Sequence, residues 1–304
     1  MAVIHYKQFD KKKAFTKDGN FSIRKIDYIH ALVTMHGVLG FTDKINLFFS
    51  YLFRLNNDLT FKSNKVSLSS DYSKAYDGIK RETSEILGAA TTIIFAHKEC
   101  KQKYVIPYET FIGSCVKGTK PDFVGIDKYG DCSLFESKGS INKVDSREIN
   151  RSIKQINDVL SNPKSPYFIN GYSVASDFNY KSLSGLTLRV YDPPCDDSNR
   201  KKVDFKDQIN KYKRFICKII NYDKNEQMCI WFDDLVYIGT RLKLDEEHYL
   251  IIGISEQEYL AISKDNTFVP IEQPSTERAI FTNDIKEEAI FEDGLYLKIT
   301  LQQE

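Results

Sequence analysis

The sequence lacks the residue patterns that mark several common protein classes. Its six cysteines include no CxxC pair, and no pair of histidines stands near them at the spacing of a zinc site. We therefore expect free thiols in a reducing compartment rather than a disulfide framework or a zinc centre. The chain also contains no phosphate-binding loop with a Gly-Lys-Ser/Thr ending, so ATP hydrolysis is not expected.

Long hydrophobic runs are scarce as well. The longest uncharged run covers residues 28–42, fifteen residues, which is too short to span a bilayer. The segment from Met1 to Lys7 does not follow a charged-then-apolar targeting pattern. We expect a cytoplasmic protein that has no membrane partner.

What the sequence does contain is an uneven distribution of charge within 304 residues that are 41% hydrophobic. Residues 1–70 carry 11 Lys/Arg against 5 Asp/Glu, residues 71–225 carry 26 against 20, and residues 226–304 carry 6 against 17. A basic body with an acidic end suggests a polyanion on one side and a different contact on the other, such as a helicase, ATPase or regulatory subunit. Charges scattered over solvated faces explain the same numbers equally well.

The order of apolar patterns indicates one mixed sheet with helices around it. Residues 1–25 read as basic and irregular. Helical patterns cover 26–56, 74–97, 145–160 and 204–221, and strand patterns cover 104–108, 111–115, 123–126, 132–135, 186–191, 231–232, 235–238, 249–254, 259–262 and 295–301. The predicted fold class is α/β (α+β), with a basic helical extension over 1–70, a mixed central sheet flanked by helices over 71–225, and a β-rich acidic region over 226–304.

Three ionisable residues on two adjacent apolar strands form the strongest chemical signal. Asp122 follows Pro121, and Glu136 and Lys138 lie fourteen and sixteen residues later. Glu136 and Lys138 are two residues apart, so their side chains share one face of a strand. Two carboxylates can hold a divalent cation, and an ammonium beside them can orient water or stabilise a charged phosphorane.

This pattern resembles the PD-(D/E)xK nuclease superfamily, whose members include restriction endonucleases, repair nucleases and bacterial anti-phage effectors. The matching residues are Pro121, Asp122, Glu136 and Lys138, within residues 74–160 and with a possible extension to 221. The resemblance implies a restriction-endonuclease-like fold and Mg²⁺-dependent cleavage of DNA, more readily than RNA, with Mn²⁺ as a possible substitute. It also implies that the carbonyl group of Ser137 adds a metal ligand, that a homodimer is possible, and that the setting is restriction or anti-phage defence.

Two further candidates lie on the flanking helices. Members of the superfamily often place an acidic residue on the helix before the motif, and Glu85 is the candidate metal ligand there, with Glu82 as its competitor. Some branches carry a glutamine on the following helix, which makes Gln155 a candidate catalytic residue. Solvated helix residues are the alternative explanation for both. For Arg147, Arg151 and Lys154, an ordinary solvated helix face is favoured over a nucleic-acid contact.

Other functions fit the same residues. Glu136 and Lys138 would form a plain ion pair if their strand were exposed, and Asp122 would then be an ordinary turn residue. A non-catalytic nucleic-acid-binding or scaffolding subunit of the same fold is the second hypothesis. A third is that the acidic region 226–304 serves as a docking surface for a partner.

Overall fold

The computed structural model describes residues 1–10, 12–36, 43–62, 64–109, 120–162, 165, 168–179, 185–192, 205–232, 234–263 and 285–301. These residues form two compact units. The first comprises residues 1–31 and 54–205, and the second comprises residues 32–53 and 206–304. The division differs from the predicted boundaries near residues 70 and 225. None of the described helices is long and apolar enough to cross a membrane.

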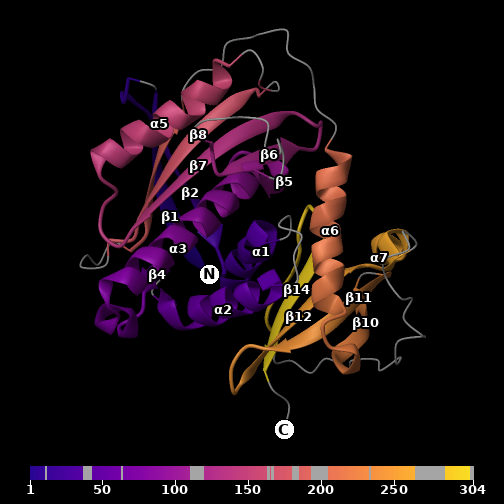
Figure 1. The fold of residues 1–304 in the computed structure, drawn as a ribbon. Helices are drawn as coiled ribbons and strands as arrows, with labels where there is room; N and C mark the ends of the chain where they lie inside the picture. Colours follow the sequence, from indigo (N-terminus) through magenta and orange to yellow (C-terminus); the bar gives the residue numbers. More distant parts are fainter. Residues whose placement is uncertain are drawn as a thin grey trace. The chain divides into compact units, whose positions relative to one another are not determined.

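A seven-stranded mixed sheet forms the centre of the first unit, in the order β2-β1-β9-β8-β7-β6-β5 (Figure 1). Its strands are β1 (Ala2–Asp10), β2 (Phe15–Ile23), β5 (Gln102–Pro107), β6 (Phe123–Asp127), β7 (Cys132–Ser140), β8 (Asn170–Asp177) and β9 (Thr187–Asp192). A separate hairpin consists of β3 (Leu59–Lys62) and β4 (Lys65–Leu68). The predicted mixed sheet flanked by helices is therefore confirmed.

Helices cover both faces of this sheet. The helices that contribute to the first unit are α1 (Lys25–His36), of which residues 32–36 belong to the second unit, α3 (Asp77–Lys98) and α5 (Ser146–Leu160), with a short 3₁₀ turn η1 (Asp71–Lys74). Gly139 of β7 faces α3, because a Cβ atom built on it would meet Ser84. Ser173 pairs with Glu136 in the sheet, and its hydroxyl contacts Ser152 of α5. Because positions 136 and 139 point to opposite faces of β7, α3 and α5 lie on opposite faces (Figure 1).

The prediction for the N-terminal residues was wrong. Residues 1–25 were expected to be irregular, yet β1 and β2 pair antiparallel and β1 pairs parallel with β9. The strand signal is visible in the alternation of buried Ile4 and Tyr6 with exposed His5 and Lys7. Strand β8 was missed as well. The predicted strand over 111–115 lies outside the described residues.

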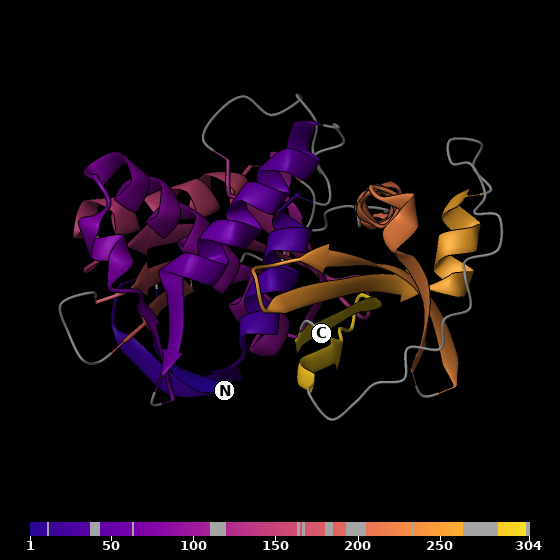
Figure 2. The same ribbon diagram turned by 90° about the horizontal axis from the view of Figure 1, so that it is seen from below.

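The second unit is built on an antiparallel five-stranded sheet, in the order β10-β11-β12-β14-β13. Its elements are α2 (Asp43–Asp58), of which residues 54–58 belong to the first unit, α6 (Lys206–Ile220), η3 (Lys224–Glu226), β10 (Gln227–Phe232), β11 (Leu235–Lys243), β12 (His248–Ser255), α7 (Glu256–Ser263), β13 (Ile285–Ile290) and β14 (Leu295–Leu301). Helices α6 and α7 both contact β11 and β12, and they lie on one face of this sheet (Figure 2). The predicted strand over 259–262 was wrong, because those residues belong to α7.

Candidate active site at the divergence of two strands

A tight turn joins the two motif strands, β6 and β7, into a hairpin. Asp127 accepts hydrogen bonds through Oδ1 from the backbone N–H groups of Tyr129 (2.8 Å) and Asp131 (2.9 Å). Gly130 supplies the positive φ of +82° that the turn requires. The turn sets the register of β6 on β7, and the pairing ends at Phe123↔Phe135. Asp122 precedes Phe123 and Glu136 follows Phe135. Both residues therefore lie just beyond the last pair, where the two strands separate.

Asp122 binds the strand edge that β6 leaves unpaired. Its Oδ2 accepts hydrogen bonds from the backbone N–H of Ser137 (2.8 Å) and from the hydroxyl of Ser137 (2.6 Å). The backbone carbonyl of Asp122 accepts a hydrogen bond from the N–H of Tyr108 (2.9 Å). These contacts fix Asp122 at both its backbone and its side chain, and they leave Oδ1 as the oxygen without a hydrogen-bond partner among the described residues.

Glu136 is almost completely buried, with 1% of its surface exposed. Its Oε1 accepts a hydrogen bond from the ammonium of Lys138 at 2.5 Å. Its Oε2 has no hydrogen-bond partner within the part of the chain that the structure describes. A buried carboxylate oxygen without a partner is costly, so it points to a ligand or a proton at this position.

Burial, and to a smaller extent the nearby carboxylate of Asp122, raise the pKa of Glu136 to about 8, although Lys138 and the backbone N–H of Asp122 oppose the shift. The protonated form of Glu136 is therefore favoured at neutral pH in the protein without bound metal. A divalent cation would compete with that proton for the same oxygen. The protonation of Glu136 would therefore change with pH and with a bound cation, as expected for two carboxylates held close together.

Gln155 reaches the motif from α5. Its Nε2 donates a hydrogen bond to the carbonyl of Lys120 at 2.9 Å, two residues before Asp122. The helix itself begins as predicted, because the side chain of Asp145 accepts a hydrogen bond from the N–H of Arg147. Gln155 therefore connects α5 with the segment that positions Asp122.

Glu85 lies apart from these residues. Its side chain is exposed on α3 and pairs with Arg81, with an Nε–Oε1 distance of 3.0 Å. Glu82, its competitor, pairs with Arg54 at 2.7 Å. No group of three or more His, Cys, Asp or Glu side chains that suits a metal ion occurs among the described residues. The structure brings together Asp122, Glu136, Ser137 and Lys138, with Gln155 beside them, and does not bring Glu85 to them.

Two neighbours of the site were not foreseen from the sequence. Tyr108 is fully buried and positions the backbone of Asp122. Ser173 of β8 lies beside Glu136 in register, and its hydroxyl contacts that of Ser152 on α5. No sequence motif marks either residue. Each is linked to the site by a strand pairing or a helix contact that exists only in the folded chain.

Comparisons of this chain with models of protein families, with curated protein sequences and with solved structures found no match. The local geometry of Asp122, Glu136 and Lys138 is therefore the basis on which a function is inferred.

Proposed function

We propose that this protein is a metal-dependent endonuclease that hydrolyses phosphodiester bonds of DNA. The observation that carries the proposal is the buried Oε2 of Glu136, which has no hydrogen-bond partner among the described residues and lies in a site shared with Asp122 and Lys138. A carboxyl group that only stabilised the fold would be expected to have both oxygens satisfied. Glu136 does contact Lys138, but its side chain is buried, whereas the plain ion-pair explanation assumed an exposed strand.

The donor set fits Mg²⁺, which binds carboxylate and carbonyl oxygens. Glu136 through Oε2 and Asp122 through Oδ1 would hold the ion, and the carbonyl of Ser137 would add a neutral ligand. When bound, the cation supplies charge stabilisation and a lowered pKa for a coordinated water. Mn²⁺ has the same preference for oxygen ligands and would substitute for Mg²⁺.

Lys138 and Gln155 have distinct roles in this proposal. The ammonium of Lys138 lies at the entrance of the buried carboxyl site, with 23% of its side chain exposed. There it would orient the attacking water or stabilise the negative charge that develops on the phosphorus oxygens. Gln155 would act as a positioning residue, because it holds the carbonyl of Lys120 and thereby the segment that carries Asp122.

The substrate is proposed from charge as well as from the resemblance. Arg147, Arg151 and Lys154 are exposed on α5, the helix that contacts the strand bearing Glu136 and Lys138. A phosphate backbone lying along this helix would be bound by these cations. A role in restriction or anti-phage defence, with a helicase, ATPase or regulatory subunit as a partner, belongs to the same proposal.

A cleavage assay on four substrates tests the function. Supercoiled plasmid, linear duplex DNA, single-stranded DNA and RNA would be incubated with Mg²⁺, Mn²⁺ or EDTA. We expect metal-dependent cutting of DNA, lost by at least two orders of magnitude in Lys138→Ala because charge stabilisation in the transition state is removed. Lys128→Ala is the matched control, since Lys128 lies in the turn between β6 and β7, at the opposite end of the hairpin from Asp122.

The outcomes separate clearly. Full activity in Lys138→Ala, or cutting that persists in EDTA, would contradict the proposal. Loss of activity in both lysine variants would indicate a general defect of the protein rather than a role for Lys138. Unchanged thermal unfolding of Lys138→Ala would confirm that the fold is intact.

A non-catalytic, nucleic-acid-binding subunit is the second candidate, and one observation favours it. The acidic residue on the preceding helix, Glu85, pairs with Arg81 instead of joining the two motif carboxylates. Calorimetric titration with Mg²⁺ discriminates the two candidates. The nuclease requires binding that disappears in Asp122→Asn and Glu136→Gln, whereas a non-catalytic subunit requires no such site.

A further inference from the structure

A second polar region lies on the edge of the seven-stranded sheet. A cleft of about 640 Å³ opens over strands β1, β2 and β9. The side chains that matter in it are His5, Lys7, Asp18, Asn20, Thr187 and Arg189. Its volume falls in the range of about 300–1,000 Å³ that is typical of small-molecule sites.

The strand register arranges these side chains in two rows. Asn20, His5 and Thr187 are cross-strand neighbours in one row. Asp18, Lys7 and Arg189 form the next row, two residues along each strand. Because residues two apart share a face, all six side chains project into the same space. Neighbouring strands are about 4.8 Å apart, so each row presents polar groups over roughly 10 Å.

A hydrophobic cluster separates this cleft from the candidate active site. Ala175 is the neighbour of both Lys138 and Arg189 in the sheet, and it is completely buried. It packs with Val144, Ile149 and other residues of the α5 region in one core cluster. The cleft is therefore a site of its own, and the inference drawn from it does not rest on the proposed nuclease function.

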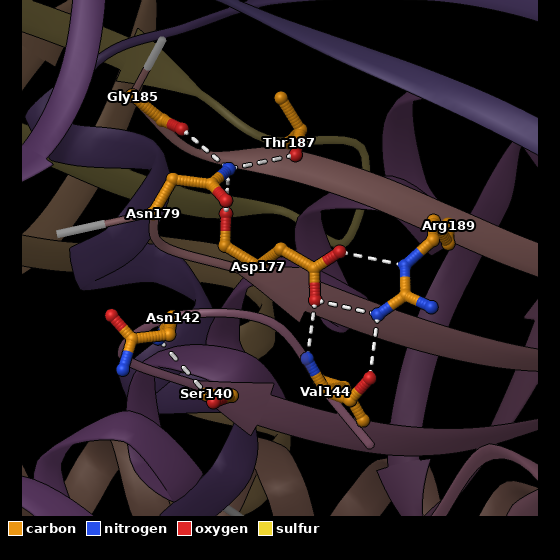
Figure 3. Close-up of polar contacts among 8 residues, drawn as sticks. All are labelled: Ser140, Asn142, Val144, Asp177, Asn179, Gly185, Thr187 and Arg189. Carbon is orange, nitrogen blue, oxygen red and sulfur yellow. Dashed lines mark hydrogen bonds and ion pairs between the residues drawn. The ribbon is translucent and has the colours of Figure 1, made fainter. Parts of the chain in front are cut away.

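At the floor of the cleft, Arg189 and Thr187 take part in a network of polar contacts (Figure 3). The guanidinium of Arg189 donates through Nε and Nη2 to both oxygens of Asp177, at 2.6 and 2.8 Å. Nη2 also donates to the carbonyl of Val144, whose N–H donates to Asp177. A bidentate pair of this kind fixes the guanidinium plane. It also uses the carboxylate of Asp177 internally, so that Asp177 is not available as a ligand group.

Thr187 is fixed in a similar way. Its Oγ1 lies 3.0 Å from the amide nitrogen of Asn179, which donates the hydrogen bond (Figure 3). The amide also contacts the carbonyls of Asp177 and Gly185. Since Oγ1 acts as the acceptor here, the hydroxyl hydrogen of Thr187 remains able to donate to a ligand.

The walls of the cleft, in contrast, are not used by the fold. His5, Lys7, Asp18 and Asn20 are exposed, and their side chains form no hydrogen bond or ion pair with another described residue. Lys7 and Asp18 are cross-strand neighbours but do not form a salt bridge with each other. An ammonium, an imidazole, a carboxylate and an amide therefore face solvent above a preorganised floor.

We propose that this cleft binds a nucleoside phosphate. The ammonium of Lys7, with the ring of His5 two residues away on the same strand, matches the charge and hydrogen-bonding capacity of a phosphate group, while Arg189, bound to Asp177 and Val144, forms the floor beside them. Asp18 would accept hydrogen bonds from sugar hydroxyls, and the amide of Asn20 would pair with the donor and acceptor edge of a base. The cleft is much larger than a phosphate ion, which is why a whole nucleotide is the expected ligand. The nucleotide is either free in solution or the terminal unit of a strand.

Isothermal titration of the full chain in EDTA tests the proposal without a contribution from the metal site. The probes are the 5′-monophosphates of the four ribonucleosides, and inorganic phosphate. We expect saturable binding of at least one nucleoside monophosphate, tighter than that of phosphate. Lys7→Gln should weaken it about tenfold, because a charge-assisted hydrogen bond is lost. Lys17→Gln is the matched control, since Lys17 is exposed on β2 with its side chain on the opposite face from Asp18.

Asp18→Asn provides a second variant on the cleft surface, and it should weaken nucleotide binding while leaving phosphate binding unchanged. The proposal is overturned if no nucleotide binds at millimolar concentration, or if Lys7→Gln and Lys17→Gln bind equally well. A 5′-phosphorylated dinucleotide distinguishes a nucleotide that is free in solution from one at the end of a strand. Tighter binding than the mononucleotide would assign the cleft to a strand end, and equal binding would assign it to free nucleotides.

Discussion

At the scale of single residues, the burial of Glu136 has a thermodynamic consequence. Its pKa rises from 4.5 to about 8 on folding in the protein without bound metal. Between these two values the folded state holds a proton that the unfolded chain has lost. The free energy of unfolding therefore falls as the pH rises through this window, and it levels off above pH 8.

This predicts a stability difference between the native protein and Glu136→Gln that depends on pH. Urea unfolding in EDTA at pH 5 and pH 8.5 should show the native protein losing a few kcal/mol relative to the variant, since one pKa unit corresponds to about 1.4 kcal/mol. Glu85→Gln, an exposed glutamate on α3, is the control and should follow the native curve. Parallel curves for the native protein and Glu136→Gln would mean that Glu136 ionises at its ordinary pKa when folded.

The proximity of the motif residues could be predicted from the sequence more readily than the position of Glu85, for a physical reason. Asp122, Glu136 and Lys138 are close because a short hairpin and strand alternation, both local features, bring them together. The position of Glu85 depends instead on how α3 rotates over the sheet, which is set by contacts between residues about fifty positions apart in the chain. Local patterns do not contain that information.

At the scale of elements, those contacts centre on two glycines. A Cβ atom on Gly88 would lie 2.7 Å from the Cα of Gly139, and one on Gly139 would lie 1.9 Å from the carbonyl oxygen of Ser84. The backbones of α3 and β7 thus approach as closely as they do because neither position has a side chain. The close approach holds α3 against the strand that carries Glu136 and Lys138.

Gly88→Ala should therefore destabilise the protein by about 1–3 kcal/mol through overpacking against a backbone that cannot move aside. Gly78→Ala on the same helix is the matched control. A Cβ atom there meets only the ring of exposed Tyr76, and we expect no loss or a gain of up to about 1 kcal/mol from helix propensity. Chemical denaturation measures both values. Equal effects of the two substitutions would show that α3 and β7 are not held by this contact.

Strands β1, β2 and β8 show the limits of predicting strands from the apolar–polar pattern of the sequence. In β8 the serines at positions 173 and 176 are completely buried, so the strand has no apolar–polar alternation to read. Their burial is tolerated because β8 lies in the interior of the sheet, with β7 and β9 on its two sides. In β1 the alternation exists, but His5 and Lys7 on the exposed face, together with the three lysines that follow at positions 11–13, give the segment the composition of a loop.

At the scale of the whole molecule, the acidic C-terminal strands belong to a unit that also uses residues from the N-terminal part of the chain. Phe48 of α2 packs edge-on against Phe215 of α6, with ring centroids 6.2 Å apart. Both rings are buried, and α6 in turn packs on β11 and β12. The sequence indicated β10, β11, β12 and β14 but not β13, and the joining of segments 32–53 and 206–304 depends on long-range packing that periodicity does not reveal.

Deletion of residues 226–304 tests this organisation. The deletion removes the five-stranded sheet but leaves α2 and α6 with apolar faces that the sheet normally helps to bury, including Ile216 and Ile219. We expect the truncated chain to self-associate, because exposed apolar patches of this kind drive association. Size-exclusion chromatography should show oligomers or aggregates where the full chain gives one peak. Introducing Ile216→Ser and Ile219→Ser into the truncated chain should reduce the association, because the same helix then presents a more polar face. A truncated chain that stays monomeric and unfolds cooperatively would mean that α2 and α6 do not need the sheet, and that the acidic region is an independent module.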